Sequence, residues 1–505
     1  AGVNAGNSIE SGGNYNVVVG DEAGTAITTG DNNTAIGNAA LDATTTSSDN
    51  SGIGYNALGA NITGASNTGV GSLALFSNTT ADNNTAVGKS ALQANTTGTQ
   101  NVAVGASALD ANTTANDNTG VGYNALTSNT TGTQNVAVGT SALGTQTDGG
   151  LYNTAVGAYT LTDNTTGDFN TGIGRMALFE NTTGGSNTSV GMNSMLDNTT
   201  GGSNTAVGES ALANNTTADN NTAVGYQTLT ANTTGASNVA VGTSALAANT
   251  TADNNTAVGY TALTANTTGA QNVAIGRDAL LGNTTGADNT SVGVSALSAN
   301  TTAANNTAVG RLALALNTTG SSNVAVGALS LDANTTGARN TAVGYNSLTA
   351  NTTAGNNTAV GDGSLSTNTT GTSNVAVGLG ALEANTTANN NTAVGYLTML
   401  ANTTGHSNTA VGFEAGKANT TGIRLTAFGY QAGKAHVATG NVQNVFVGNE
   451  AGLGNTTGVT NTFIGGSAGA ANTTGSQNIA VGTNALGANT TAGDNVAIGN
   501  GALGA

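Results

Sequence analysis

Residues 255–271 read NTAVGYTALTANTTGAQ, and residues 272–288 repeat the pattern as NVAIGRDALLGNTTGAD. Numbered from the Asn that opens this stretch, 29 such units follow one another between residues 16 and 505 at a spacing of 17 residues. A fixed short period is typical of solenoids, in which each unit buries its apolar side chains only by stacking on its neighbours. The period is therefore the strongest evidence for the fold.

The spacing is interrupted twice. One extra residue falls within residues 144–152 and two fall within residues 434–443. Both insertions lie between the apolar parts of successive units, where a surface turn accommodates additional length. We therefore interpret residues 16–505 as one continuous repeat array with irregular turns near 144–152 and 434–443, preceded by an N-terminal lead segment at residues 1–15.

Four positions of the unit are nearly constant. Position 1 is Asn in all units but one, position 4 is Val, Ile or Phe, position 5 is always Gly, and position 9 is Leu or Met in 24 units. NTAVG and ALTA are short apolar pieces, NTTGAQ has the composition of a turn, and no window keeps a helical pattern. The sequence predicts an all-β, parallel β-solenoid (β-roll) of about 29 coils, each with two short strands. Stacking at ~4.8 Å would give a rod about 140 Å long.

The two-residue alternation of a strand assigns the faces. Positions 2 and 4 share one face, and positions 1, 3 and 5 share the other. We expect position 4 and the Leu of position 9 to point inward. The predicted structural core in two representative units is then Val258, Gly259, Leu263, Ile275, Gly276 and Leu280.

This assignment leaves a face of Asn, Ala and Gly that is nearly bare of side chains. Each coil offers about two large apolar residues, worth about 1.5–3 kcal/mol each when buried. Ordering a coil costs on the order of 25 kcal/mol, at about 1.5 kcal/mol per residue. The thin core predicts that the chain associates with itself through its Ala/Gly face.

The core NTAVGxxAL with an Asn-rich turn resembles the YadA-like head repeat of trimeric autotransporter adhesins, over residues 16–505. Similar repeats occur in phage tail-fibre-like proteins and secreted fibre proteins. The resemblance implies a left-handed β-roll, three chains side by side and a role in adhesion. The unit departs from the common head repeat in being 17 residues long, with NTT in its turn.

The composition argues against several classes of function. The net charge of −17, with only 8 Lys and Arg, disfavours nucleic-acid binding, which requires clustered basic residues. No apolar run approaches the ~18–20 residues that span a membrane, so the chain is not expected to cross one. With no Cys, and with His406 and His436 far apart in turns, we expect no enzyme, no catalytic residues, no metal site and no cofactor. Scattered Asp residues such as Asp82, Asp219 and Asp253 are expected to form turns rather than bind calcium.

Tyrosine recurs at position 6, just after the constant Gly, where an outward side chain could contact glycans or neighbouring chains. The candidates for surface contacts are Tyr55, Tyr123, Tyr226, Tyr260, Tyr345, Tyr396 and Tyr430. The alternative is that these rings only shield the bend.

The sequence therefore predicts a non-enzymatic, extracellular structural fibre subunit on a cell or virion surface, with a role in surface adhesion. Its expected partner is itself, as a homotrimer or a head-to-tail filament. The alternative is a phage tail fibre or adhesin head that binds a glycan or protein on a host surface.

Overall fold

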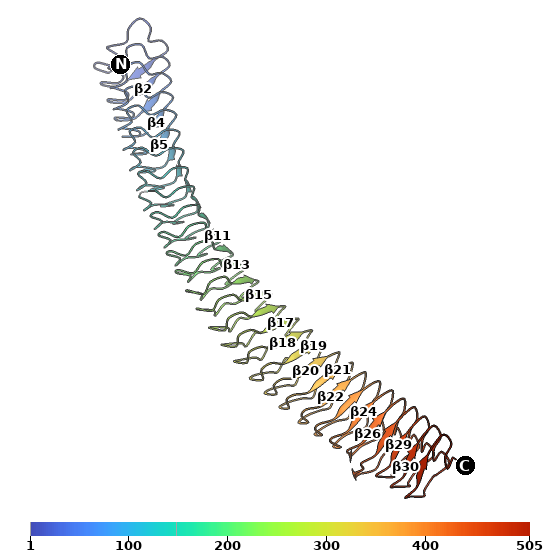
Figure 1. The fold of residues 1–505 in the computed structure, drawn as a ribbon. Coiled ribbons are helices and arrows are strands. Elements are labelled where there is room, and N and C mark those ends of the chain that lie inside the picture. Colours follow the sequence, from blue (N-terminus) through green and yellow to red (C-terminus); the bar gives the residue numbers. More distant parts are fainter. Residues whose placement is uncertain (1, 148, 505) are drawn as a thin grey trace. The chain divides into compact units, whose positions relative to one another are not determined.

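The structure is a computed structural model that describes residues 2–147 and 149–504. It confirms a parallel β-solenoid with a 17-residue repeat, in about 29 turns. The chain forms two compact units, residues 1–254 and 255–505. Within each unit successive coils stack with their strands on the same side (Figure 1). No helix in the described part of the chain is long and apolar enough to cross a membrane.

The strands of the first unit are β1 (Val17–Val19), β2 (Thr34–Ile36), β3 (Ser51–Ile53), β4 (Thr68–Val70), β5 (Thr85–Val87), β6 (Val102–Val104), β7 (Thr119–Val121), β8 (Val136–Val138), β9 (Thr154–Val156), β10 (Thr171–Ile173), β11 (Thr188–Val190), β12 (Thr205–Val207), β13 (Thr222–Val224) and β14 (Val239–Val241).

The strands of the second unit are β15 (Thr256–Val258), β16 (Val273–Ile275), β17 (Thr290–Val292), β18 (Thr307–Val309), β19 (Val324–Val326), β20 (Thr341–Val343), β21 (Thr358–Val360), β22 (Val375–Val377), β23 (Thr392–Val394), β24 (Thr409–Val411), β25 (Gly422–Ile423), β26 (Thr426–Phe428), β27 (Gly440–Asn441), β28 (Val445–Val447), β29 (Thr462–Ile464), β30 (Ile479–Val481) and β31 (Val496–Ile498).

Each regular coil contains one strand, at positions 2–4, rather than the two that we expected. The ALTA segment forms turns instead, because the backbone at positions 7 and 9 is left-handed: φ is +52° at Thr261 and +55° at Leu263. The turns still bond to the next coil, since the amide of Leu263 donates to the carbonyl of Ala279 at 2.9 Å. The coils are therefore hydrogen-bonded along this side although it contains no strand.

The strand faces are the reverse of our assignment. Ala257 and Ala274, at position 3, are fully buried, whereas Val258 is half-buried and Ile275 is 40% exposed. Placing Val258 and Ile275 in the core was therefore wrong. The interior beside the strand has room only for a small side chain, because the leucine of position 9 fills the coil.

The remaining core residues agree better with expectation. Leu263 and Leu280 are fully buried, as predicted. Gly259 and Gly276 are half-buried and serve the backbone: their φ angles are +140° and +131°, a region that L-residues rarely adopt. A Cβ on Gly259 would also lie 2.5 Å from the carbonyl oxygen of Gly276 in the next coil. The constant glycine thus meets both a backbone and a packing requirement.

Two columns of buried asparagine hold the coils in register. At position 1, the amide N of Asn272 donates to Oδ1 of Asn255 at 2.9 Å. At position 12, Nδ2 of Asn283 donates to Oδ1 of Asn266 at 2.9 Å and to the carbonyl of Gly286 at 2.8 Å. These bonds satisfy polar groups that would otherwise be costly to bury.

The two units that contain the insertions have a residue other than Asn at position 12. Where one residue is added, Gln146 replaces Asn, and its longer amide still reaches Oδ1 of Asn129 at 3.0 Å. Where two are added, His436 replaces Asn, and the lengthened turn contains β27, which pairs with β25 of the preceding coil. The lead segment is hydrogen-bonded to the first coil: the backbone amide of Gly6 donates to the carbonyl of Ala23 at 2.9 Å.

Candidate functional site

Reversing the strand faces puts the branched side chains of positions 2 and 4 on the outside. We call these outward side chains of the strands the Thr/Val face. Thr256 lies beside Val273, and Val258 lies beside Ile275, in register in neighbouring strands. Within each unit the face therefore presents columns of β-branched side chains rather than isolated apolar residues. Contiguous exposed apolar surface of this kind marks interaction sites in soluble proteins.

The exposure of position 4 is similar in both units. The side chains that are 36–42% exposed include Ile36 and Val104 in the first unit, and Ile275, Val309 and Phe428 in the second. Valine at position 2 is exposed to the same degree, as Val102 and Val324 are. Because positions 2 and 4 point outward, alternating Thr and Val at position 2 leaves the interior unchanged.

The tyrosines of position 6 point outward, as the sequence predicted. Their exposed fractions are 54% for Tyr55, 58% for Tyr123, 46% for Tyr226, 59% for Tyr260, 52% for Tyr345, 45% for Tyr396 and 47% for Tyr430. Their role in binding stays a prediction.

Two of these tyrosines belong to an aromatic column. Tyr396, Phe413 and Tyr430 occupy position 6 of three successive coils, with ring centroids 5.2 Å apart and interplanar angles of 12° and 10°. Stacked exposed rings form a column of apolar ring edges with a tyrosine at each end. Such a column is suited to contact the apolar C–H groups of a ligand such as a sugar.

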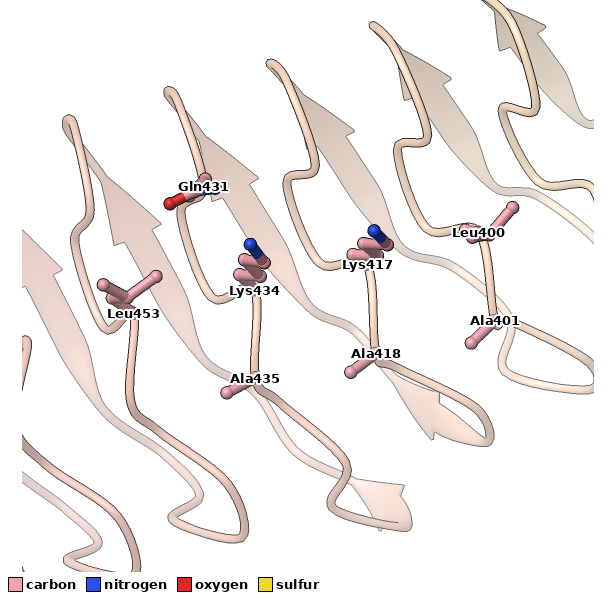
Figure 2. Close-up of a pocket in the computed structure, with 8 residues that line it drawn as sticks. All are labelled: Leu400, Ala401, Lys417, Ala418, Gln431, Lys434, Ala435 and Leu453. Carbon is pink, nitrogen blue, oxygen red and sulfur yellow. The ribbon is translucent and has the colours of Figure 1, made fainter.

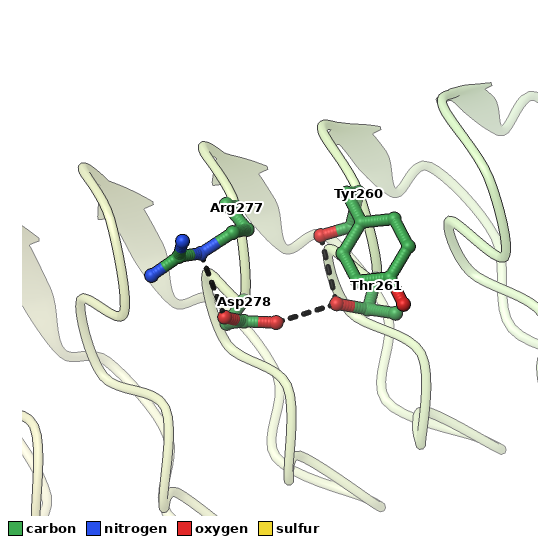
Figure 3. Close-up of polar contacts among 4 residues, drawn as sticks. All are labelled: Tyr260, Thr261, Arg277 and Asp278. Atoms are coloured by element: carbon green, nitrogen blue, oxygen red, sulfur yellow. Dashed lines mark hydrogen bonds and ion pairs between the residues drawn. The ribbon is translucent and has the colours of Figure 1, made fainter.

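Tyr260 lies instead beside a charged bend (Figure 3). The Thr261 hydroxyl lies 2.6 Å from Oδ1 of Asp278, and Nε of Arg277 lies 3.1 Å from Oδ2 of the same carboxylate. The first contact joins position 7 of neighbouring coils, and the second joins positions 6 and 7 within one coil. Arg277 is largely exposed, so this ion pair contributes little to stability.

A cluster of charged side chains joins two successive coils of the second unit. The Glu414 carboxylate accepts from Nζ of Lys417 at 2.5 Å, from Nζ of Lys434 at 2.6 Å and from Nε2 of Gln431 at 2.9 Å. The hydrogen bond from Lys417 and, to a smaller extent, the one from Lys434 lower the pKa of Glu414 from 4.5 to about 2. The carboxylate is therefore ionised at neutral pH, and the cluster carries one excess positive charge.

Sequence reasoning missed this cluster, although a signal for it was present. The string AGKA occurs at residues 415–418 and again at 432–435, one repeat apart. In a stacked fold this spacing places Lys417 and Lys434 in adjacent coils at the same position.

The residues considered for metal binding or catalysis have local roles. The carboxylates of Asp82, Asp219 and Asp253 accept hydrogen bonds from backbone amides of the preceding coil at 2.6–2.7 Å, which confirms them as turn residues. No group of three His, Asp or Glu side chains in the described residues is placed to hold a metal ion. His406 is exposed in a turn, and His436 is buried in the position-12 column.

Neither a model of a known protein family nor a curated protein matches the chain.

Proposed function

We propose that the chain is a non-enzymatic structural fibre subunit that acts outside the cell or on its surface, associates with copies of itself and supports adhesion. The observation that carries this proposal is the Thr/Val face. It repeats the same outward β-branched side chains in coil after coil within each unit. A second copy, which has the same repeat along its length, could match this face over many coils.

This interface differs from the Ala/Gly face that the sequence suggested. Ala257 and Ala274 are fully buried within a single chain, so the alanines cannot form a contact between chains. The asparagines of position 1 are buried as well, at Asn255 and Asn272. The proposed contact therefore uses Thr256, Val258 and their equivalents, whose burial between copies would remove apolar surface from water.

A fibre subunit of this kind is also consistent with the repeat itself. Adding a coil lengthens the stack and extends the Thr/Val face without introducing a new arrangement of side chains. The likeness to trimeric adhesin heads supports three chains side by side, and a head-to-tail filament is the other arrangement that we consider.

Electron microscopy of the purified protein tests this proposal. We expect particles wider than one solenoid, with two or more parallel rods, or filaments that contain them. Uniform single rods at all protein concentrations would contradict self-association. Gold labelling of the native source with an antibody would separately test the expected extracellular location.

A second candidate function is supported by the aromatic column. Tyr396, Phe413 and Tyr430 form an exposed stacked strip, which favours an adhesin head or phage fibre that binds a glycan on a host surface. Screening the protein against immobilised glycans, with Phe413→Ala beside wild type, tests this alternative. Loss of a specific signal in the variant would support it, and the same signal from both proteins would contradict it.

A further inference from the structure

A groove runs along the second unit beside the charged cluster. Its main part encloses about 580 Å³, within the usual range of small-molecule sites. Figure 2 shows Leu453, Lys434, Lys417 and Leu400 in line on four successive coils, with the two ammonium groups between the leucines. Alanines, including Ala418, form the rest of the lining. The groove is thus apolar along its length and cationic at its centre.

The two lysines have hydrogen-bonding capacity to spare. Each ammonium group has three N–H donors, and among the described residues each contacts one acceptor, the Glu414 carboxylate. Lys417 and Lys434 remain 29% and 36% exposed, whereas Glu414 is 10% exposed. Glu414 therefore holds both ammonium groups from the protein side while their other donors stay accessible from the groove.

We propose that this groove binds a small amphiphile with one carboxylate and an unbranched or flat apolar body. The ligand's carboxylate would lie between Lys417 and Lys434, opposite Glu414, and its apolar body would pack on Leu400 or Leu453. Charge complementarity favours this occupant, since one buried carboxylate faces two ammonium groups and leaves the cluster with one excess positive charge. The inference does not depend on self-association of the chain.

The far end of the groove adds selectivity. Beyond Leu400 and Ala401 the groove continues past Glu383 and Thr367, with a further volume of about 320 Å³. A second carboxylate at the other end of the ligand would meet either leucine side chains or the charge of Glu383. The site should therefore favour a monocarboxylate over a dicarboxylate of the same length.

Isothermal titration calorimetry at pH 7 with octanoate, 1-octanol and octanedioate tests the proposal on the full chain. We expect octanoate to bind one per chain with a Kd of about 1 mM or below. Octanol and octanedioate should bind at least about tenfold more weakly, because a charged hydrogen bond is lost or a second charge is added. Each CH2 added from hexanoate to decanoate should tighten binding about threefold.

Three variants distinguish binding in this groove from nonspecific binding of octanoate to the protein. Lys434→Gln should weaken octanoate binding about tenfold. Lys89→Gln removes a lysine of the first unit that does not line the groove and should leave binding unchanged. Glu414→Gln should tighten binding, because both ammonium groups then lack their competing carboxylate. Circular dichroism of each variant confirms that it is folded.

The results that support the site differ from those that overturn it. Octanoate binding that weakens in Lys434→Gln and tightens in Glu414→Gln supports the site. The proposal is overturned if octanoate does not bind saturably, if octanol binds equally well, or if folded Lys434→Gln binds like wild type. The opposite directions expected for the two variants keep the test valid even if one of them folds poorly.

Discussion

The ring of Phe446 fills the space where Gly452 lacks a side chain. A Cβ on Gly452 would lie 2.7 Å from Cδ1 of the ring, and one on Gly433, in the preceding coil, would lie 2.5 Å from Cδ2. Position 3 is usually Ala and position 9 usually Leu, so here a large and a small residue have exchanged places. Phe463 and Gly469 repeat the exchange in the next coil, with a Cβ–ring distance of 2.5 Å.

Larger neighbours also lie against the glycine of position 9 in other coils. Gly416 gives room to Leu425, and Gly24 gives room to Val18, since an added Cβ would lie 3.1 Å and 2.8 Å from these side chains. Glycine at position 9 thus accompanies a larger neighbour inside the coil. It needs no role in contacts between chains.

Gly452→Leu should therefore destabilise the protein, by about 1–3 kcal/mol for an overpacked core. Phe446→Ala alone should cost about 3–5 kcal/mol through the cavity that it leaves. The double variant restores the usual Ala–Leu pair within this coil and should cost less than the sum of the two. Urea denaturation of the four proteins measures this coupling, and strictly additive losses would show that the two residues do not share one space.

An adjacent pair of glycines tests the constant position 5. Gly465 has φ of +132°, and a Cβ there would lie 2.6 Å from backbone atoms of Gly482. Gly466, its neighbour, has ordinary backbone angles, and its nearest atom would be 3.9 Å away.

We expect Gly465→Ala to cost at least about 2 kcal/mol, from backbone strain together with the clash. Gly466→Ala should be neutral or stabilise slightly, because it restricts only the unfolded chain. Thermal melts of the two variants provide the comparison. If both shift the melting temperature equally, the close backbone approach does not explain the constant glycine.

His436 makes the stability of its region depend on pH. It is fully buried, its Nδ1 lies 3.1 Å from Nδ2 of Asn455, and its Nε2 and Oδ1 of Asn419 have no hydrogen-bond partner among the described residues. Burial lowers the pKa of His436 from 6.5 to about 4. The folded state therefore takes up this proton at a lower pH than the unfolded state does.

Above pH 6.5 both states hold His436 neutral, so its contribution does not change with pH. As the pH falls from 6.5 to about 4 the unfolded state gains the proton first, and stability should fall by roughly 3 kcal/mol. His436→Asn restores the usual residue of position 12 and should lose this component. Urea midpoints at pH 7.5 and 4.5 measure it; equal pH dependence in variant and wild type would contradict a buried neutral histidine.

The period of the sequence was sufficient to predict the parallel solenoid, because only stacking in register places Asn255 on Asn272 and Gly259 on Gly276. The orientation of the strand could not be derived from alternation alone. Thr256 and Val258 share one face and Ala257 the other, and hydrophobicity favoured burying Val258. The volume inside the coil determines which face is buried. Because Leu263 fills most of that volume, only a side chain as small as that of Ala257 fits beside it.

A clue to this volume was present in the rarer units. Phenylalanine replaces the small residue of position 3 at Phe446 and Phe463, and in those same units glycine replaces leucine at position 9. Such compensation indicates that positions 3 and 9 meet inside the coil. The second strand was predicted wrongly for a different reason: left-handed backbone at a leucine such as Leu263 is rare and has no simple sequence signal.

The most direct test of the proposed function is sedimentation velocity on a variant of the Thr/Val face. Ile275→Lys with Val309→Lys places charges on two exposed strand positions, while Thr285→Lys with Thr319→Lys places them on exposed turns of the same coils. We predict that wild type and the turn variant sediment as oligomers and that the face variant shifts to the 48.3 kDa monomer. A wild type that is monomeric at all concentrations, or a face variant that stays as oligomeric as wild type, would contradict self-association through this face.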